Sequence, residues 1–292
     1  MDYNSLKFTE RAIKSLLQYH SELVEKIIVV DNYGLSGYEN LFNITQKIMI
    51  IKPGRNLGFG RSINLAMKYV DTPLVLLQNP DTIIKMNILD IMIKKLTSDE
   101  KLAAVSVMAN TPEGKEVLAR RFTKAYDIVG GRRSPLLKLK LFKKIGERYR
   151  YMDKLNEEKP FYVDAFTGTF VLLKKDAFFK VGGFDPGYFL FMEDVDLSRK
   201  LRLSGYEIMV IPYLEITHHT GSTRKRAPLK SGFSKAKSVY MYFVKWREIK
   251  KLSRPFVGLL LGLYTILILF LDFFSIQRPE QSWKMRSRKR HF

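Results

Sequence analysis

The chain has 292 residues, no cysteine and a formal net charge of +21. The lack of cysteine excludes disulfides, thiolate metal sites and cysteine nucleophiles. With only four histidines, a metal site would depend mainly on carboxylates, which favours hard cations such as Mg²⁺ or Mn²⁺. The basic excess indicates an anionic partner; nucleic acid, an acidic membrane surface and a phosphorylated substrate each fit it.

The first part of the chain alternates between predicted helices and strands. Helices are expected over Leu6–Tyr19, Gly60–Val70 and Asn87–Leu96, and strands over Lys26–Val30, Lys47–Ile51, Thr72–Leu77 and Ala103–Met108. This alternation is typical of an α/β unit with a parallel sheet, which binds ligands at the carboxyl ends of its strands. Asp31, Asn56 and Asp81 each follow a predicted strand, so we expect them on one rim of the sheet.

The second part is less regular. Residues 109–160 are basic and weakly periodic, and we interpret them as an insertion or a mobile loop. Regular patterns then predict a strand over Phe166–Leu173, a short helix capped by Asp176, a turn at Gly182–Asp185, a helix over Glu193–Ser204, a strand over Tyr206–Ile211 and a loop at Thr217–Ser222.

An apolar run near the C-terminus, Phe256–Leu271, is flanked by basic residues on both sides, at Lys245–Arg254 and Arg286–Arg290. The run is shorter than the about 20 residues that span a bilayer. Basic flanks on both sides suit a helix or hairpin lying in the cytoplasmic leaflet beside anionic lipid. A spanning helix and a buried core helix are the alternatives. Because no signal peptide pattern precedes Leu6, we expect a cytoplasmic protein, peripheral or C-terminally anchored at the membrane.

The acidic cluster Glu193, Asp194 and Asp196 opens a predicted helix. Carboxylates are stabilised at a helix N-terminus, so a purely structural capping role is one interpretation. Catalysis is the other, because the apolar segment Phe189–Met192 precedes these carboxylates. Desolvation against that segment would raise a carboxyl pKa and make a better base.

Three further signals are weak on their own. Asp81, in Asn79-Pro80-Asp81, could hold a cation that bridges two phosphates, or it could simply belong to a turn. At most one of His218 and His219 would bind a ligand, because adjacent side chains on an extended chain point different ways. The segment Asn56–Gly60 resembles a phosphate loop but lacks the Lys-Ser/Thr pair of a P-loop.

Taken in order, these stretches resemble glycosyltransferase family 2, with the GT-A fold, and specifically its rhamnosyltransferase-like branch. They are Tyr3-Asn4-Ser5, Val29–Asn32, Arg55–Gly60 with Asn64, Gln78–Asp81, Phe166–Phe170, Gly182–Asp185, Phe191–Leu197 and His218–Ser222. The resemblance implies an α/β fold: a Rossmann-like mixed sheet with flanking helices, plus the C-terminal apolar helix. It implies a GT-A domain over 1–223, in which 109–160 is a basic acceptor region, and a helical, membrane-associated segment over 224–292.

The resemblance also implies roles for single residues. Asp194 would be the general base, with Glu193 and Asp196 on the acceptor side. Asp81 and His218 would hold Mg²⁺ or Mn²⁺ on the donor diphosphate. The nucleotide-sugar would be bound by Asp31, Asn56, Gly58, Asn64 and Asn79.

The implied function is an inverting glycosyltransferase of polysaccharide biosynthesis. It would move a sugar, with rhamnose the specific expectation, from a nucleotide-diphosphate sugar to a hydroxyl of a glycan or lipid-linked acceptor. A diphosphate leaves without a general acid when a metal neutralises it, so one carboxylate base suffices, whereas glycosidases need two.

Two alternatives stay open. The family has a strand before Tyr3, and Met1 stands where that strand would end. A catalytically inactive nucleotide-sugar-binding homologue is therefore one alternative. A basic nucleic-acid-binding protein is the other. The sequence lacks the aromatic–basic interleaving of such proteins, so we expect no nucleic-acid partner.

Overall fold

The computed structural model describes residues 1–34, 37–122, 124, 140–219 and 228–276. The helices are α1 (Leu6–His20), η1 (Tyr38–Asn43), α2 (Phe59–Met67), α3 (Leu89–Thr97), α4 (Lys140–Tyr149), η4 (Met152–Lys154), α5 (Lys175–Lys180), α6 (Glu193–Leu203), α7 (Pro228–Lys245), η6 (Lys251–Ser253) and α8 (Arg254–Ile276). The strands are β1 (Ile27–Val30), β2 (Ile48–Ile51), β3 (Leu74–Gln78), β4 (Thr82–Ile83), β5 (Leu102–Thr111), β6 (Gly114–Val117), β7 (Ala119–Arg120), β8 (Phe161–Tyr162), β9 (Ala165–Phe166), β10 (Phe170–Lys174) and β11 (Glu207–His218).

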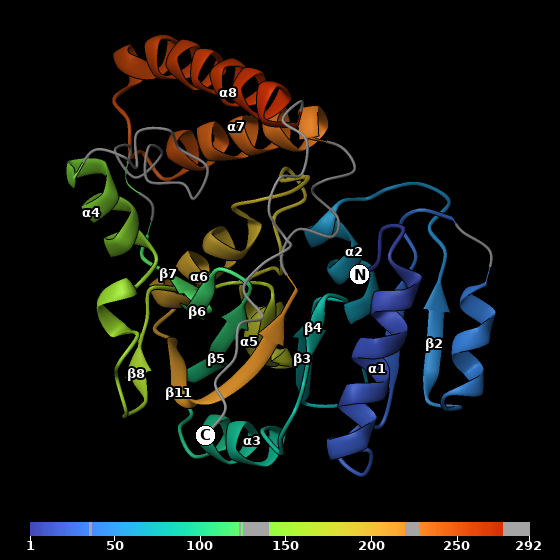
Figure 1. The fold of residues 1–292 in the computed structure, drawn as a ribbon. Coiled ribbons are helices and arrows are strands. Elements are labelled where there is room, and N and C mark those ends of the chain that lie inside the picture. Colours follow the sequence, from blue (N-terminus) through green and yellow to red (C-terminus); the bar gives the residue numbers. More distant parts are fainter. Residues whose placement is uncertain (35–36, 123, 125–139, 220–227, 277–292) are drawn as a thin grey trace, which may run out of the picture.

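The main sheet is mixed. Its order is β3-β10-β5-β11-β4, with β6 on β5 and β8 on β11 (Figure 1). Strand β11 runs parallel to β5, whereas β10 runs antiparallel to β3 and β5. Phe170, the first residue of β10, pairs with Gln78, the last residue of β3. The chain therefore enters β10 at the rim of the sheet where β3 ends. The alternation of helices and strands in the sequence predicted a parallel sheet and did not reveal this antiparallel strand.

Strands β1 and β2 form a separate parallel pair. Its link to the N-terminus is an isolated parallel bridge between Asp2 and Asp31, in which Asp2 N–H donates to the Val30 carbonyl and Asn32 N–H to the Asp2 carbonyl. The N-terminal residues therefore lie beside the end of β1, next to the loop that carries Asp31.

Two apolar clusters cover the two faces of the main sheet. One contains Ile63 and Met67 of α2 together with Leu197 and Leu201 of α6. The other contains residues of α3 and Leu16 of α1. Burial on both faces explains why Leu102–Ala109 of β5 is fully buried and lacks the polar alternation of a half-exposed strand. Helices α2 and α6 thereby lie on the same face.

Several predicted boundaries need correction. The strand predicted over Phe166–Leu173 is two strands, β9 and β10, separated at residues 167–169. The strand predicted over Tyr206–Ile211 continues to His218, in the predicted loop, because β4 pairs with its last residues. Part of the predicted 109–160 insertion belongs to the sheet as β6 and the end of β5. Asp176 lies in the first turn of α5, and Lys174 occupies the N-cap. The predicted basic stretches around Gly130–Arg133 and Arg286–Arg290 lie outside the described residues.

The C-terminal helices α7 and α8 pack on each other (Figure 1), and Val239 and Tyr242 of α7 share an apolar cluster with Val195 of α6. The apolar run predicted near the C-terminus is helical, within α8. Within the ranges that the structure describes, no helix combines the length and the apolar character needed to cross a membrane.

Candidate active site

Asp31 lies directly after β1 and is almost fully buried. Its Oδ1 accepts hydrogen bonds from the backbone N–H groups of Tyr33 (3.0 Å) and Gly34 (2.9 Å). Its Oδ2 is buried and has no hydrogen-bond partner among the described residues. A buried carboxylate oxygen without a donor is costly, so this atom is suited to accept an N–H or O–H group of a ligand.

The neighbouring Asn32 fixes the glycine-rich segment. Its Nδ2 donates to the Ser62 hydroxyl (2.7 Å) and to the Gly58 carbonyl (3.3 Å), while its Oδ1 accepts from Leu57 N–H (3.3 Å). Asn56 Oδ1 in turn accepts from Gly58 N–H (2.9 Å). The loop that begins at Asn56 is thereby held against the Asp31 loop, and both lie at the carboxyl ends of β1 and β2.

Gly58 cannot be replaced without moving the backbone. Its φ is +80°, and a Cβ there would lie 2.1 Å from the carbonyl oxygen of Phe189. The next residue, Phe59, donates its N–H to the same oxygen (3.1 Å). Gly58 therefore lets the loop touch the segment that leads into α6, which carries the acidic cluster.

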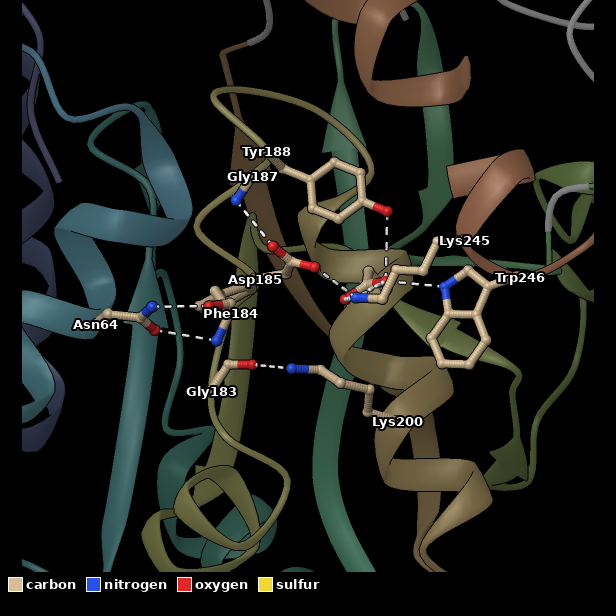
Figure 2. Close-up of polar contacts among 10 residues, drawn as sticks. Asn64, Gly183, Phe184, Asp185, Gly187, Tyr188, Lys200, Lys245 and Trp246 are labelled. Carbon is tan, nitrogen blue, oxygen red and sulfur yellow. Dashed lines mark hydrogen bonds and ion pairs between the residues drawn. The ribbon is translucent and has the colours of Figure 1, made fainter. Parts of the chain in front are cut away.

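The side-chain amide of Asn64 contacts the backbone of Phe184. Its Nδ2 donates to the Phe184 carbonyl (2.8 Å), and its Oδ1 accepts from Phe184 N–H (3.0 Å), as Figure 2 shows. Both ends of the amide are therefore occupied by the protein backbone. Asn64 therefore connects the 182–185 turn to α2, and its contact with the nucleotide stays a prediction.

Asp81 and His218 lie next to each other because β4 pairs with the end of β11. His218 Nε2 is 3.5 Å from Asp81 Oδ1, and both side chains are mostly buried. His219 N–H donates to the Asp81 carbonyl (2.8 Å). His218 Nδ1 is buried and finds no partner in the part of the chain that the structure describes. Asn79 is half-buried two residues away, and its backbone N–H donates to Thr169 (2.9 Å).

This pair fits a divalent cation that takes most of its ligands from a substrate. No group of three or more His, Asp or Glu side chains that could hold a metal occurs among the residues described. Mg²⁺ commonly takes only one or two protein carboxylates and completes its shell with water and substrate phosphate. Asp81 with His218 offers such a partial set, and the buried, unpartnered nitrogen is consistent with a ligand at this position.

The acidic cluster divides into three different environments. Asp194 is half-buried, and its carboxylate accepts from Gly168 N–H (3.1 Å) and Val195 N–H (2.9 Å). Glu193 is 5% exposed, and its Oε2 has no partner among the described residues. Asp196 is 0% exposed and bonded to Lys245, Trp246 and Tyr188. Asp196 is thus engaged by the protein, rather than facing an acceptor as expected.

Burial raises the pKa of both Glu193 and Asp194. For Glu193 desolvation is the main cause, the charge of Asp194 adds to it, and together they raise the pKa to about 8. For Asp194 desolvation also raises the pKa, but the N–H groups of Gly168 and Val195 and the cation of Arg120 oppose the rise. These donors and Arg120 stabilise the negative charge of Asp194 rather than that of Glu193, which suits Asp194 to act as a general base.

The raised pKa of Glu193 predicts a pH-dependent stability. The folded chain keeps this proton up to about pH 8, whereas the unfolded chain releases it above about 4.5, so stability falls as pH rises through that window. We expect Glu193→Gln to match wild type at pH 4 and to exceed it by about 1–3 kcal/mol at pH 8. Urea unfolding at both pH values measures this; an equal difference at the two pH values would contradict the assignment.

Three residues near the site were not singled out by the sequence patterns. Arg120, on β7, forms an ion pair with Glu116 (2.7 Å) and lowers the pKa of Asp194 by its charge. Thr167 is buried beside Gly168, and its hydroxyl lacks a partner within the described ranges. The Tyr33 ring packs edge-on against Tyr3, 5.1 Å between centroids, beside Asp31. Thr167 lies inside the recognised Phe166–Phe170 motif and Tyr33 directly follows Val29–Asn32, whereas no motif marked Arg120.

Comparison with known proteins decides the family. The profile of glycosyl transferase family 2 matches residues 3–180. The chain belongs to this family. The predicted resemblance is confirmed at the level of the family.

Curated relatives include two rhamnosyltransferases. The chain is 26% identical over 207 residues to an N-acetylglucosaminyl-diphospho-decaprenol L-rhamnosyltransferase of Mycobacterium tuberculosis, covering 67% of this chain and 66% of the relative. It is 29% identical over 205 residues to rhamnosyltransferase WbbL of Escherichia coli, covering 65% of this chain and 71% of the relative. The match thus spans just under two thirds of the length of the mycobacterial relative.

Solved structures confirm the fold class. The mannosyltransferase PcManGT of Pyrobaculum calidifontis, in complex with GDP-Man and Mn²⁺, superposes with a TM-score of 0.56 at 13% identity, covering 95% of this chain and 79% of that one. GalNAc-T7 with UDP, GalNAc and Mn²⁺ superposes with a TM-score of 0.54 at 11% identity, covering 78% and 44%. The GT-A-like mixed α/β fold is therefore as predicted.

Proposed function

We propose that this chain is an inverting glycosyltransferase that moves a sugar from a nucleotide-diphosphate sugar to an acceptor hydroxyl. The observation that carries the proposal is the distribution of unpartnered buried polar atoms. Three of them belong to residues of the family motifs, Asp31 Oδ2, His218 Nδ1 and Glu193 Oε2, whereas others among the described residues, such as His20 Nδ1 of α1 and Arg254 Nε of α8, lie outside these motifs. Buried polar groups are nearly always paired, so unpaired atoms on three of the family motifs favour a ligand that contacts these motifs.

Each residue of the site has a separate proposed role. Asp31 accepts a hydrogen bond from the base or ribose, and the Asn56–Gly58 loop lines the nucleotide. Asp194, held by Gly168 and Val195, takes the proton from the acceptor hydroxyl as the new bond forms at the anomeric carbon and the bond from that carbon to the diphosphate oxygen breaks. Glu193, protonated near neutral pH because of its raised pKa, donates to a hydroxyl of the bound sugar or acceptor.

The diphosphate is held on the opposite side by Asp81 and His218, with Asn79 beside them. A bound Mg²⁺ or Mn²⁺ would neutralise the charge that develops on the diphosphate. With the base on the face opposite to the leaving group, attack inverts the anomeric centre. The proposed donor is therefore a nucleotide-diphosphate sugar, bound with a divalent cation.

Rhamnose is the sugar that the curated relatives favour. Both relatives are rhamnosyltransferases, and the mycobacterial one is named for a diphospho-decaprenol acceptor. We therefore include a lipid-linked glycan among the acceptors to be tested first, and the net charge of +21 is compatible with an acceptor that carries phosphate.

A screen of nucleotide-sugars tests the proposed function. Each donor, with Mn²⁺ and with lipid-linked acceptors, is assayed for release of the nucleoside diphosphate, and thermal stabilisation is measured in parallel. We expect at least one donor to be turned over only in the presence of metal, dTDP- or UDP-linked rhamnose being the first to test. Binding without turnover would favour the inactive homologue, and retention of DNA without donor binding would favour the nucleic-acid alternative.

The exposed face of α8 carries a second proposal, that the chain binds the surface of an anionic membrane. Large apolar side chains line this face: Phe256 (63% exposed), Leu259 (61%), Leu260 (47%), Leu263 (54%), Ile266 (56%) and Leu267 (46%). Leu261 and Thr265, on the other face, are buried. Lys250 and Lys251 are exposed at the N-terminal end of α8. An apolar helix face beside basic residues suits the interface of a bilayer that contains acidic lipid.

Vesicle binding checks this placement. We expect Leu259→Glu with Leu263→Glu to lower the vesicle-bound fraction about tenfold or more, because each leucine contributes about 2 kcal/mol of apolar burial. Co-sedimentation with vesicles of phosphatidylcholine, with and without phosphatidylglycerol, measures it. Leu203→Glu is the matched control, since Leu203 is 72% exposed but lies on α6. Equal losses in the two variants, or binding that ignores the acidic lipid, would contradict the proposal.

A further inference from the structure

The first turns of α6 are tied to the end of α7 by a buried polar cluster around Asp196. Asp196 is 0% exposed, and its carboxylate accepts from Lys245 Nζ (2.9 Å) and Trp246 Nε1 (2.8 Å), with the Tyr188 hydroxyl at 3.4 Å. Lys245 also contacts Asp185 at 2.6 Å. Figure 2 shows Lys245 reaching between Asp185 and the start of α6, with Trp246 beside it.

The chain enters α6 through a turn with an unfavourable backbone conformation. Phe191 and Met192 have φ values of +71° and +68°, a region that residues with a side chain seldom occupy. Such a turn persists only where its surroundings hold it. Here α7 supplies a contact, because the Ser238 hydroxyl donates to the Leu190 carbonyl (2.9 Å). Asp196 N–H donates to the Met192 carbonyl (2.8 Å), which connects the turn to the cluster.

Asp194 lies between the turn and Asp196, so its place depends on both. Its carbonyl accepts from the Ser198 hydroxyl (2.7 Å), and Ser198 also accepts from Phe166 N–H (3.3 Å). These bonds fix the helix after Asp194, whereas the cluster around Asp196 fixes its first turn against α7. A rotation of that turn would move the Asp194 carboxylate away from Gly168.

We propose that Lys245 is a positioning residue for the general base. By pairing with the buried Asp196 it holds the first turn of α6, and the C-terminal helix α7 thereby becomes part of the catalytic domain. The domain boundary expected near residue 223 would then divide a single functional unit, because the segment after it helps to position the base in the segment before it. This inference rests on the proposed role of Asp194 in transfer.

A second ion pair between the same regions provides a matched control. Arg199 Nη1 pairs with Glu248 (2.6 Å) and donates to the Tyr242 hydroxyl (3.1 Å). Like the Lys245–Asp196 pair, it connects α6 to the C-terminal end of α7 and the residues after it. Arg199, however, lies about one helical turn further from Asp194 than Asp196 does. A purely structural role would make loss of either pair equivalent for turnover.

The experiment compares Lys245→Met, Lys245→Arg, Glu248→Gln and the double variant Lys245→Met with Asp196→Leu. The double variant replaces the buried ion pair with apolar side chains, a change that is often neutral or stabilising, and its melting temperature shows whether it folds. Thermal melting, kcat and donor KM are measured, together with amide hydrogen exchange over 191–198.

We expect Lys245→Met and the double variant to lower kcat about tenfold with donor KM unchanged, and to speed exchange at the first turn of α6. Lys245→Arg should recover most of the activity, and Glu248→Gln should lower the melting temperature without changing kcat or that exchange. A double variant with wild-type kcat and exchange would overturn the proposal, as would an equal loss of kcat in Glu248→Gln. If the wild-type chain transfers no sugar, the proposed function fails, while the exchange data still decide whether Lys245 holds the turn.

Discussion

Asp194→Asn is expected to lower kcat for sugar transfer about 10³-fold, within the range that a positioned base contributes. Asparagine has the same shape and can still accept one of the two hydrogen bonds from Gly168 and Val195, but it cannot take a proton. Donor affinity, measured by calorimetry with Mn²⁺, should stay within about twofold of wild type, because the donor contacts lie elsewhere.

The pH dependence of this variant provides a second check. In wild type, kcat should fall as the pH drops through the pKa of Asp194, which burial raises above its usual value, because the protonated acid cannot act as a base. The residual activity of Asp194→Asn should lack this acid limb. Asp176→Asn, a substitution at an exposed carboxylate of α5, should leave both kcat and the profile unchanged. Near-full turnover of Asp194→Asn would show that another group is the base.

Gly58→Ala is expected to have the second largest effect. The added Cβ would lie 2.1 Å from the Phe189 carbonyl oxygen, at a φ of +80°. The loop must therefore move away from the segment that leads into α6, which displaces the nucleotide relative to Asp194. A misplacement of about 1 Å can cost about 10²-fold in rate, and we expect a loss of that order in kcat/KM for the donor.

Gly54→Ala distinguishes backbone strain from the close contact with Phe189, which are the two causes of the loss expected in Gly58→Ala. Gly54 has a similar φ of +74°, but nothing lies within 4 Å of the position of its Cβ. We expect it to lower the free energy of unfolding by about 1 kcal/mol through backbone strain alone, with kcat/KM unchanged. Gly58→Ala should lower that free energy by about 2–4 kcal/mol, because the close contact adds to the strain. Chemical unfolding and donor kinetics of both variants provide the comparison, and equal kinetic losses would contradict it.

The order of motifs predicted the family and the fold class, and several of the motifs follow buried strands. The β-branched run before Asp31 and the apolar run before Asn79 are local signals of buried strands, and the structure places both runs in strands, β1 and β3. Alternation did not predict the direction of β10. That direction depends on where the chain returns after the 109–160 region, which no local pattern encodes.

The parts of the site that the sequence did not predict depend on distant partners. Asp196 resembled a member of the acidic cluster, but its role is set by Lys245 and Trp246, about fifty residues later in the chain. Asn64 belonged to the nucleotide motif, yet its amide pairs with Phe184, 120 residues away. The roles of Asp194, Asp81, His218 and Asp31 in binding and catalysis stay predictions, which the unpartnered atoms around them support.

The stereochemistry of transfer tests the central proposal most directly. Once the screen has identified a donor, proton NMR of the product gives the anomeric configuration of the transferred sugar. A single base at Asp194, opposite to a diphosphate held by Asp81 and His218, predicts inversion relative to the donor. A product that retains the configuration of the donor would contradict this mechanism.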